Sequence, residues 1–271
     1  MNRATLDNTV FTTICDYPNA DDVSASIKRT AEHFGVPLTF ISYGGAFDEM
    51  VDKLPKTLSY LQSVPDTIKY IFFVDCRDVV FVDTPQNIID EFNLCYNGGV
   101  LFAGANRWNL YPYREIELER RIEAVYGSQG FANSGTYTGS VTEVMSLLER
   151  LLELREAFYD DDDDPIVRIF KQKPEFIAKR KRYLESDQFL VQALSMDSNS
   201  AVRIDVHKRL FAFFGGTVFP PLHPRRYNRN GIEGFSPIGL AKILHSHNMS
   251  QDRNAWNHWI DQVICRERGK N

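Results

Sequence analysis

The chain has 271 residues, of which 43% are hydrophobic and 25% charged, an ordinary balance for a globular protein with a substantial core. Its formal net charge of −5 gives no general reason to bind nucleic acid or membranes, so any basic partner surface has to be local. No apolar run approaches the ~20 residues of a membrane span, and the start lacks the apolar core of a signal peptide. We therefore expect a single domain over residues 1–271 in the cytoplasm.

Strand and helix patterns alternate through the first 78 residues. Apolar side chains recur at helical spacing in two segments, and short β-branched or aromatic runs precede, separate and follow them. This order predicts a parallel sheet covered by helices. The expected strands are 10–15, 38–42 and 70–74, and the expected helices are 21–34 and 53–63.

The later part of the chain continues this alternation. Thr84-Pro85 opens a helix, and Asn133-Ser134-Gly135 is a small-residue stretch that allows close backbone approach. Acidic and amide groups at 185–188 precede an apolar helix, for which Asp187 could simply be the N-cap. Further expected helices are 114–126, 141–158 and 189–194, further strands are 100–103, 202–206 and 210–214, and 220–230 is a loop.

The stretch Tyr-Ile-Phe-Phe-Val-Asp-Cys-Arg-Asp at 70–78 is the most informative part of the sequence. Five apolar residues predict a strand buried on both faces, and Asp75 and Asp78 must then lie just beyond its carboxyl end. Ligands of open α/β sheets bind at that end, and two carboxylates on one turn can hold Mg²⁺ or Mn²⁺. The alternative is an ordinary turn or helix cap, since Asp favours turns.

Several other patterns have mainly structural interpretations. The aspartates at 160–164 and the basic run at 179–182 are typical of solvated surfaces, with a second cation site and a phosphate or nucleic-acid patch as the alternatives. A late apolar run reaches His245 and His247. The cysteines are widely spaced without a C-x-x-C pair, so free thiols are expected. They are Cys15, Cys76, Cys95 and Cys265.

Motifs of several enzyme classes are absent from the sequence. It has no G-x-G-x-x-G, Walker A, G-x-S-x-G or H-E-x-x-H pattern, which disfavours dehydrogenases, P-loop NTPases, serine hydrolases and zinc proteases. A metal-dependent transferase remains open, because its nucleotide site can be built from strand ends.

Six pieces of sequence occur in an order that resembles a known family. The order is similar to that of the glycosyltransferase domain of procollagen lysyl hydroxylases and their viral and bacterial relatives, which have the GT-A fold, and the resemblance covers about residues 8–250. The pieces are 72–80, 101–105, 132–135, 187–189, 204–208 and 244–248.

The resemblance implies an α/β, Rossmann-like GT-A domain with a mixed, mostly parallel central sheet flanked by helices. It implies a UDP-sugar-dependent glycosyltransferase that uses Mn²⁺ (or Mg²⁺) to move a hexose to a hydroxyl acceptor. The metal ligands would be Asp75, Asp78 and His245. The nucleotide would contact Thr13, Ile14, Cys15, Lys53 and Arg77. Relatives carry an aromatic residue at the position of Arg77. Asn133 and Asp187 would line the sugar side.

Two other functions stay open on the sequence. One is a nucleotidyltransferase of related fold, and the other is a nucleotide-sugar-binding protein without turnover. The acceptor is a protein, a glycan, a small molecule or a modified nucleic acid, the last because Lys and Arg concentrate in the C-terminal half.

Overall fold

The computed structural model describes residues 3–46, 48–105, 131–160, 163–197, 199–214, 241–246 and 253–268. Two of the expected segments, 114–126 and 220–230, lie outside these ranges, as do His247 and the side chain of Cys265.

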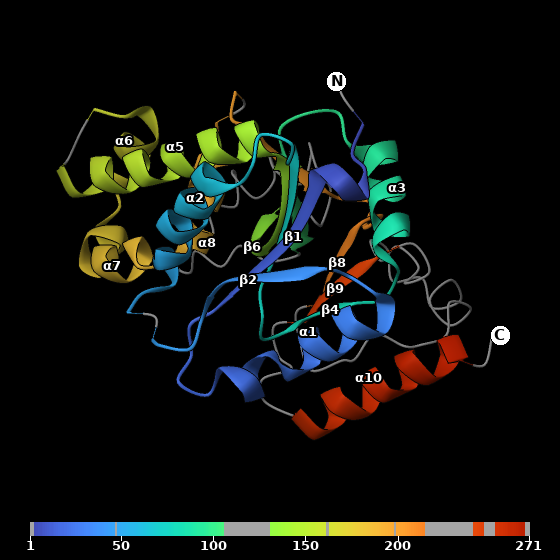
Figure 1. Ribbon diagram of the computed structural model, residues 1–271. Helices are drawn as coiled ribbons and strands as arrows, with labels where there is room; N and C mark the ends of the chain where they lie inside the picture. The colour runs from blue at the N-terminus through green and yellow to red at the C-terminus, as the bar shows by residue number, and fades with distance from the viewer. Residues whose placement is uncertain are drawn as a thin grey trace, which may run out of the picture.

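The described residues form an α/β fold around a six-stranded mixed sheet with the strand order β2-β1-β3-β6-β5-β7 (Figure 1). Every adjacent pair of strands is parallel except those of β6, which runs antiparallel to both β3 and β5. This arrangement confirms the expected mixed, mostly parallel sheet of a Rossmann-like GT-A domain. The strands are β1 Thr9–Cys15, β2 Leu38–Tyr43, β3 Tyr70–Val74, β5 Val100–Ala105, β6 Phe131–Ser140 and β7 Val202–Asp205.

Helices cover both faces of this sheet, with α2, α5 and α8 on one side and α1 and α3 on the other (Figure 1). The alternation of β3 side chains explains the division, because Phe72 packs against Phe92 of α3 while Phe73 stacks on Tyr137 of β6 at 4.8 Å between ring centroids. The helices are α1 Ala20–Phe34, α2 Lys53–Ser63, α3 Pro85–Cys95, α5 Val141–Asp160, α6 Pro165–Lys171, α7 Pro174–Leu184 and α8 Asp187–Leu194.

A second, three-stranded sheet in the order β4-β9-β8 lies beside the first. Its strands are β4 Val79–Phe81, β8 Phe211–Phe214 and β9 Ile243–Ser246, and helix α10, Arg253–Arg268, packs against it through Trp256, Trp259 and Ile260. The α10 helix also contacts α1. Strand β9 is antiparallel to β4 and brings His245 opposite Val79, one residue after Asp78.

Short 3-10 turns precede two of the elements. The first is η1, Leu6–Asn8, and the second is η2, Met50–Asp52, which leads directly into α2. No described helix is long and apolar enough to cross a membrane. The three cysteines that the structure describes with their side chains, Cys15, Cys76 and Cys95, are free thiols.

Most of the expected elements are confirmed, with α2 matching the expected 53–63 at both ends. The sequence reasoning missed α6 and α10 and did not assign β4 or β6 as strands. Strand β6 lacks a clear alternation because nine of its ten residues are buried, and its small residues do not have strong strand propensity.

Candidate active site

Asp75 and Asp78 lie on the short connection between β3 and β4. Strand β3 is buried along its whole length, and the chain leaves the sheet at Val74, so Asp75 is the first residue that reaches the sheet edge. The Asp75 N–H donates to Gly135 O at 2.7 Å, and the Ser246 N–H donates to Asp78 O at 2.8 Å. The backbone of the Asp-x-x-Asp segment is therefore fixed by both β6 and β9.

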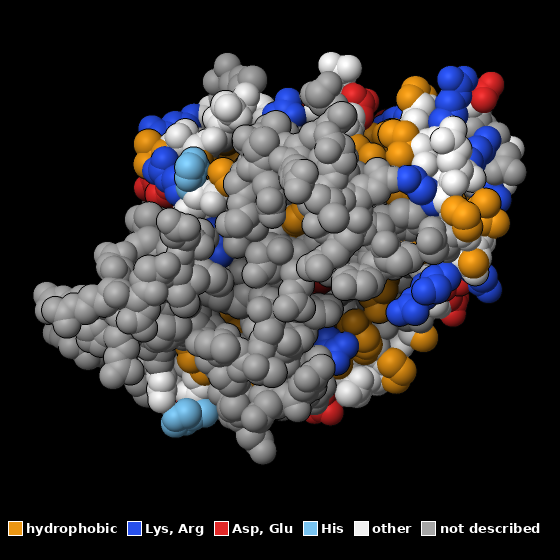
Figure 2. All heavy atoms as spheres, turned by 180° about the vertical axis from the view of Figure 1, so that it is seen from behind, with side chains coloured by type: hydrophobic (Ala, Val, Ile, Leu, Met, Phe, Trp, Pro, Cys, Tyr) orange, Lys and Arg blue, Asp and Glu red, His pale blue; other side chains and the backbone are white. Residues whose placement is uncertain are grey.

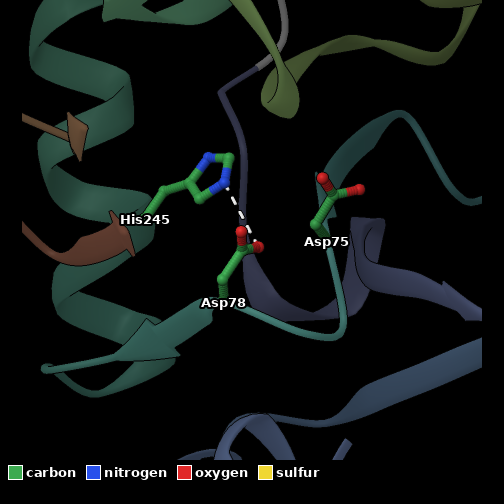
Figure 3. A group of neighbouring side chains, drawn as sticks. All are labelled: Asp75, Asp78 and His245. Atoms are coloured by element: carbon green, nitrogen blue, oxygen red, sulfur yellow. Dashed lines mark ion pairs between the residues drawn. The ribbon is translucent and has the colours of Figure 1, made fainter. Parts of the chain in front are cut away.

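Three side chains converge at this edge: Asp75, Asp78 and His245 (Figure 3). One potential ligand atom from each lies within 4.8 Å of those of the other two. His245 Nε2 is 3.2 Å from Asp78 Oδ1, and both side chains are nearly buried, whereas the Asp75 side chain keeps 27% of its surface exposed. The residues that the resemblance named as metal ligands are thus brought together.

Because Gly135 has no side chain, it provides the room that this cluster needs. A Cβ atom at this position would lie 2.4 Å from His245 Cε1 and 2.6 Å from Asp75 Oδ2. Residues 134–136 also have no partner in the β5–β6 register, which jumps from Phe102–Tyr137 to Ala103–Asn133. This bulge, together with the absence of a side chain, lets β6 approach the cluster closely.

The donor set suits a divalent cation. Two carboxylates and one imidazole match the preferences of Mn²⁺ and similar ions, and the exposed part of Asp75 leaves it accessible. Burial raises the pKa of Asp75, with Lys53 opposing and Asp78 adding to that effect. Burial lowers the pKa of His245, but Asp78 and Asp75 outweigh burial and leave it above its ordinary value. A cation would relieve the repulsion between the two carboxylates.

Lys53 and Asp187 extend the cluster on the α2 and α8 side. Lys53 Nζ lies 3.0 Å from Asp75 Oδ1 and 2.8 Å from Asp187 Oδ2, with 9% of the lysine side chain exposed. Burial alone would lower the pKa of Lys53, but Asp187 and Asp75 raise it above its ordinary value. The lysine, expected to face a nucleotide, bridges two acidic groups of the site.

Asp187 is the first residue of α8, and it is Ser186 that caps the helix, its side chain accepting a hydrogen bond from Phe189 N. The cap interpretation of Asp187 is therefore wrong, and its carboxylate remains available to Lys53. Gln188 anchors the helix to β6, since its Oε1 accepts from Ser134 N at 2.8 Å and from Ser134 Oγ, and its Nε2 donates to Ala132 O. The sequence piece 187–189 did not predict this anchoring role of Gln188.

The other expected site residues have different environments. Asn133 is buried and its side-chain oxygen accepts from Gly135 N at 2.9 Å, so this amide shapes the β6 bulge. Thr13, Ile14 and Cys15 are buried at the carboxyl end of β1, the neighbour of β3. Arg77 is exposed on the connection between the two aspartates.

Tyr17 is a further residue near the site that sequence reasoning assigned only to a turn. Burial raises the pKa of its hydroxyl to about 12, and Cys76 and Asp75 add to this effect. Its position two residues beyond the end of β1 is the signal that could have identified it, because loops at that sheet edge carry ligand contacts.

The two charge runs have structural roles where they are described. Asp164 caps α6 by accepting hydrogen bonds from Ile166 N and Val167 N. The basic run lies on α7, where Arg180 donates to Tyr159 O and Lys181 pairs with Glu185. In Figure 2 the Lys and Arg side chains occupy several separate places among the coloured atoms. These observations agree with solvated helix surfaces.

A comparison with protein-family models finds that residues 40–169 match the family described as PLOD GT domain. The matched segment includes Lys53, Asp75, Arg77, Asp78 and Asn133 and ends before Asp187 and His245. A comparison with curated proteins found no match.

Proposed function

We propose that this chain, whose residues 40–169 match the PLOD GT domain family, transfers a hexose from a UDP-sugar to a hydroxyl acceptor with the aid of a divalent cation. The observation that carries the proposal is the convergence of Asp75, Asp78 and His245 at the carboxyl end of β3. The family match supports glycosyl transfer, and the donor atoms of the cluster support Mn²⁺ or Mg²⁺.

In the proposed reaction the bond between the anomeric carbon and the UDP oxygen breaks, and a bond from the acceptor oxygen to that carbon forms. The acceptor hydroxyl releases its proton to water, and UDP leaves with additional negative charge. Asp75, Asp78 and His245 would hold the cation, whose chemistry when bound is to stabilise that charge as a Lewis acid.

The remaining residues have proposed roles in binding and orientation. Thr13, Ile14 and Cys15 would line the uridine pocket at the end of β1, with the exposed Arg77 beside the diphosphate. Asn133 would contribute to the sugar side by holding the β6 backbone around Gly135.

We assign Asp187 to the donor sugar. Its carboxylate is held in place by the buried Lys53, whose Nζ lies 2.8 Å from Asp187 Oδ2. A carboxylate held in this way is suited to accept hydrogen bonds from sugar hydroxyls. Asp187→Asn should therefore raise the KM for the donor as well as lower kcat. A variant with a near-normal transfer rate and normal donor binding would show that Asp187 has no role in the reaction.

A donor screen tests the proposed function. The protein is incubated with Mn²⁺ and individual UDP-sugars, including UDP-glucose and UDP-galactose, while free UDP and thermal stability are both measured. One donor should raise the melting temperature and release UDP, because a ligand that binds the folded state stabilises it. Pyrophosphate release from a nucleoside triphosphate would instead indicate a nucleotidyltransferase, and UDP binding without turnover would indicate a binding protein.

A further inference from the structure

Lys53 forms ion pairs with both Asp75 and Asp187. These two acidic residues come from different elements, the end of β3 and the start of α8, and Lys53 itself is the first residue of α2. One buried cation therefore joins three parts of the chain at the cluster. A buried lysine without anionic partners would be strongly disfavoured, so the two pairs are needed for Lys53 to remain charged in this position.

The backbone around Lys53 is fixed to the segment that leads into Asp187. The Val51 N–H donates to Glu185 O at 3.0 Å. Arg155 of α5 bridges the same two segments, since its Nη2 lies 2.6 Å from Glu49 Oε2 and its Nε donates to Leu184 O at 3.2 Å. These contacts hold η2 against the junction of α7 and α8. The Lys53–Asp187 pair is thus built into the packing of the fold.

The charge of Lys53 has two opposite consequences for the cluster. It offsets the negative charge of Asp187, which keeps that buried carboxylate in place. It also binds Asp75, which is one of the groups that would hold a cation, and it repels a cation at that position. Because the lysine is nearly buried, this repulsion is screened less than it would be at the surface.

We propose that Lys53 is a positioning residue that holds Asp75 and Asp187 in one arrangement for sugar transfer and weakens cation binding in the absence of donor. This inference rests on the proposed function. A lysine that competes for Asp75 makes tight cation binding depend on a negatively charged diphosphate, which neutralises the added positive charge. The site would then favour the cation together with the nucleotide over the cation alone.

The test compares Lys53→Met with the wild type in two assays, Mn²⁺ binding without nucleotide and UDP-sugar transfer. Methionine keeps the approximate length of the side chain and removes its charge. We expect Mn²⁺ alone to bind roughly tenfold more tightly, because a competing and repelling charge is gone. We expect the transfer rate to fall roughly 100-fold, because Asp187 loses the partner that orients it. If Lys53 had only a structural role, Lys53→Met would weaken both Mn²⁺ binding and sugar transfer.

Asp187→Asn provides the second variant, since it nearly preserves shape and removes one buried charge. Lys53 would then pair with Asp75 alone, so Mn²⁺ binding without nucleotide should become severalfold weaker, the opposite direction from Lys53→Met. If Lys53→Met does not fold, this measurement decides the question, and unchanged or tighter binding in Asp187→Asn would overturn the proposal. Lys28→Met, which removes the same charge from the exposed Lys28–Asp21 pair, is the matched control and should change neither assay.

The outcomes separate this inference from the proposed function. A wild-type protein that binds no Mn²⁺ would mean that the cation site itself is wrong. A wild-type protein that binds Mn²⁺, with Lys53→Met binding it equally or more weakly, would overturn the role of Lys53 and leave the proposed function standing. Tighter Mn²⁺ binding in Lys53→Met without sugar transfer by the wild type would support the charge competition and reject the transferase activity.

Discussion

Two groups of buried carboxylates in this protein are stabilised in different ways. Asp205, at the end of β7, accepts backbone hydrogen bonds from Arg209, Leu210 and Phe211 at 2.8–3.1 Å. Asp75 and Asp78, at the end of β3, are paired with the ionisable side chains of Lys53 and His245. Both groups lie at the carboxyl ends of strands in one sheet, yet their partners differ in kind.

The difference distinguishes a structural carboxylate from the proposed cation ligands. Asp205 uses both oxygens to hold the turn from β7 to β8, so its charge is dispersed over a fixed backbone. Asp75 and Asp78 are paired with charged or ionisable side chains rather than with the N–H groups of a turn. A bound cation could replace those partners without disrupting the backbone. Burial raises the pKa of Asp205 and of Asp75 alike, so the pKa alone does not distinguish the two roles.

The largest expected effect is on the ligand-binding group. Asp75→Ala combined with Asp78→Ala should abolish the Mn²⁺-dependent part of UDP binding, a loss of roughly 100-fold or more, because no carboxylate ligand remains. Calorimetric titration of UDP with Mn²⁺ and with chelator measures this part directly. The double variant should still fold, and UDP binding equal to that of the wild type in Mn²⁺ would show that the metal assignment is wrong.

The matching change in the structural group is Asp205→Ala. It leaves three turn N–H groups without their acceptor, so the free energy of unfolding should fall by roughly 3 kcal/mol. Urea denaturation gives the stability, and Mn²⁺ titration of the folded variant should match the wild type. A large loss of Mn²⁺ affinity with little loss of stability would contradict the distinction between the two groups.

A smaller effect is expected from filling the space beside the cluster. Gly135→Ala places a methyl group against His245 and Asp75, so Mn²⁺ affinity should fall roughly tenfold as the ligands are displaced. Gly139→Ala on the same strand is the control, because its Cβ would meet Gly99 O and Val144 rather than a ligand. Equal Mn²⁺ affinities in the two variants would argue against the importance of the close approach at Gly135.

The smallest effect concerns a further carboxylate, Glu143 of α5, which resembles Asp205 in its structural role. Burial acts to raise its pKa, but hydrogen bonds from Ser140, Tyr96 and Gly99 outweigh burial and lower it. A lowered pKa gives stability above the unfolded-state pKa that is lost as pH falls through the folded-state value. Glu143→Gln should therefore be less stable than wild type at neutral pH, with the difference shrinking below about pH 4.

Thermal or urea unfolding at several pH values measures this difference. The Mn²⁺ affinity of Glu143→Gln at neutral pH should remain that of the wild type. A stability difference that grows with falling pH would mean that the ionised Glu143 does not stabilise the fold.

The sequence alone determined the local elements and the position of the acidic pair. The apolar run at 70–74 followed by Asp75 and Asp78 required a buried strand with carboxylates just beyond it, because such charges cannot remain unpaired inside a sheet. Helical spacing located α1 and α2 for the same kind of local reason. The resemblance added His245, which no local pattern could connect to residues about 170 positions earlier.

Only the tertiary structure decided which groups meet at the site. The antiparallel pairing of β4 with β9 brings His245 beside Asp78, and the bulge in β6 brings Gly135 against His245 and Asp75. The packing of η2 on the α7–α8 junction places Lys53, the expected nucleotide contact, between Asp75 and Asp187. These contacts join residues far apart in the chain. They depend on strand order, register and packing, which spacing along the sequence does not encode.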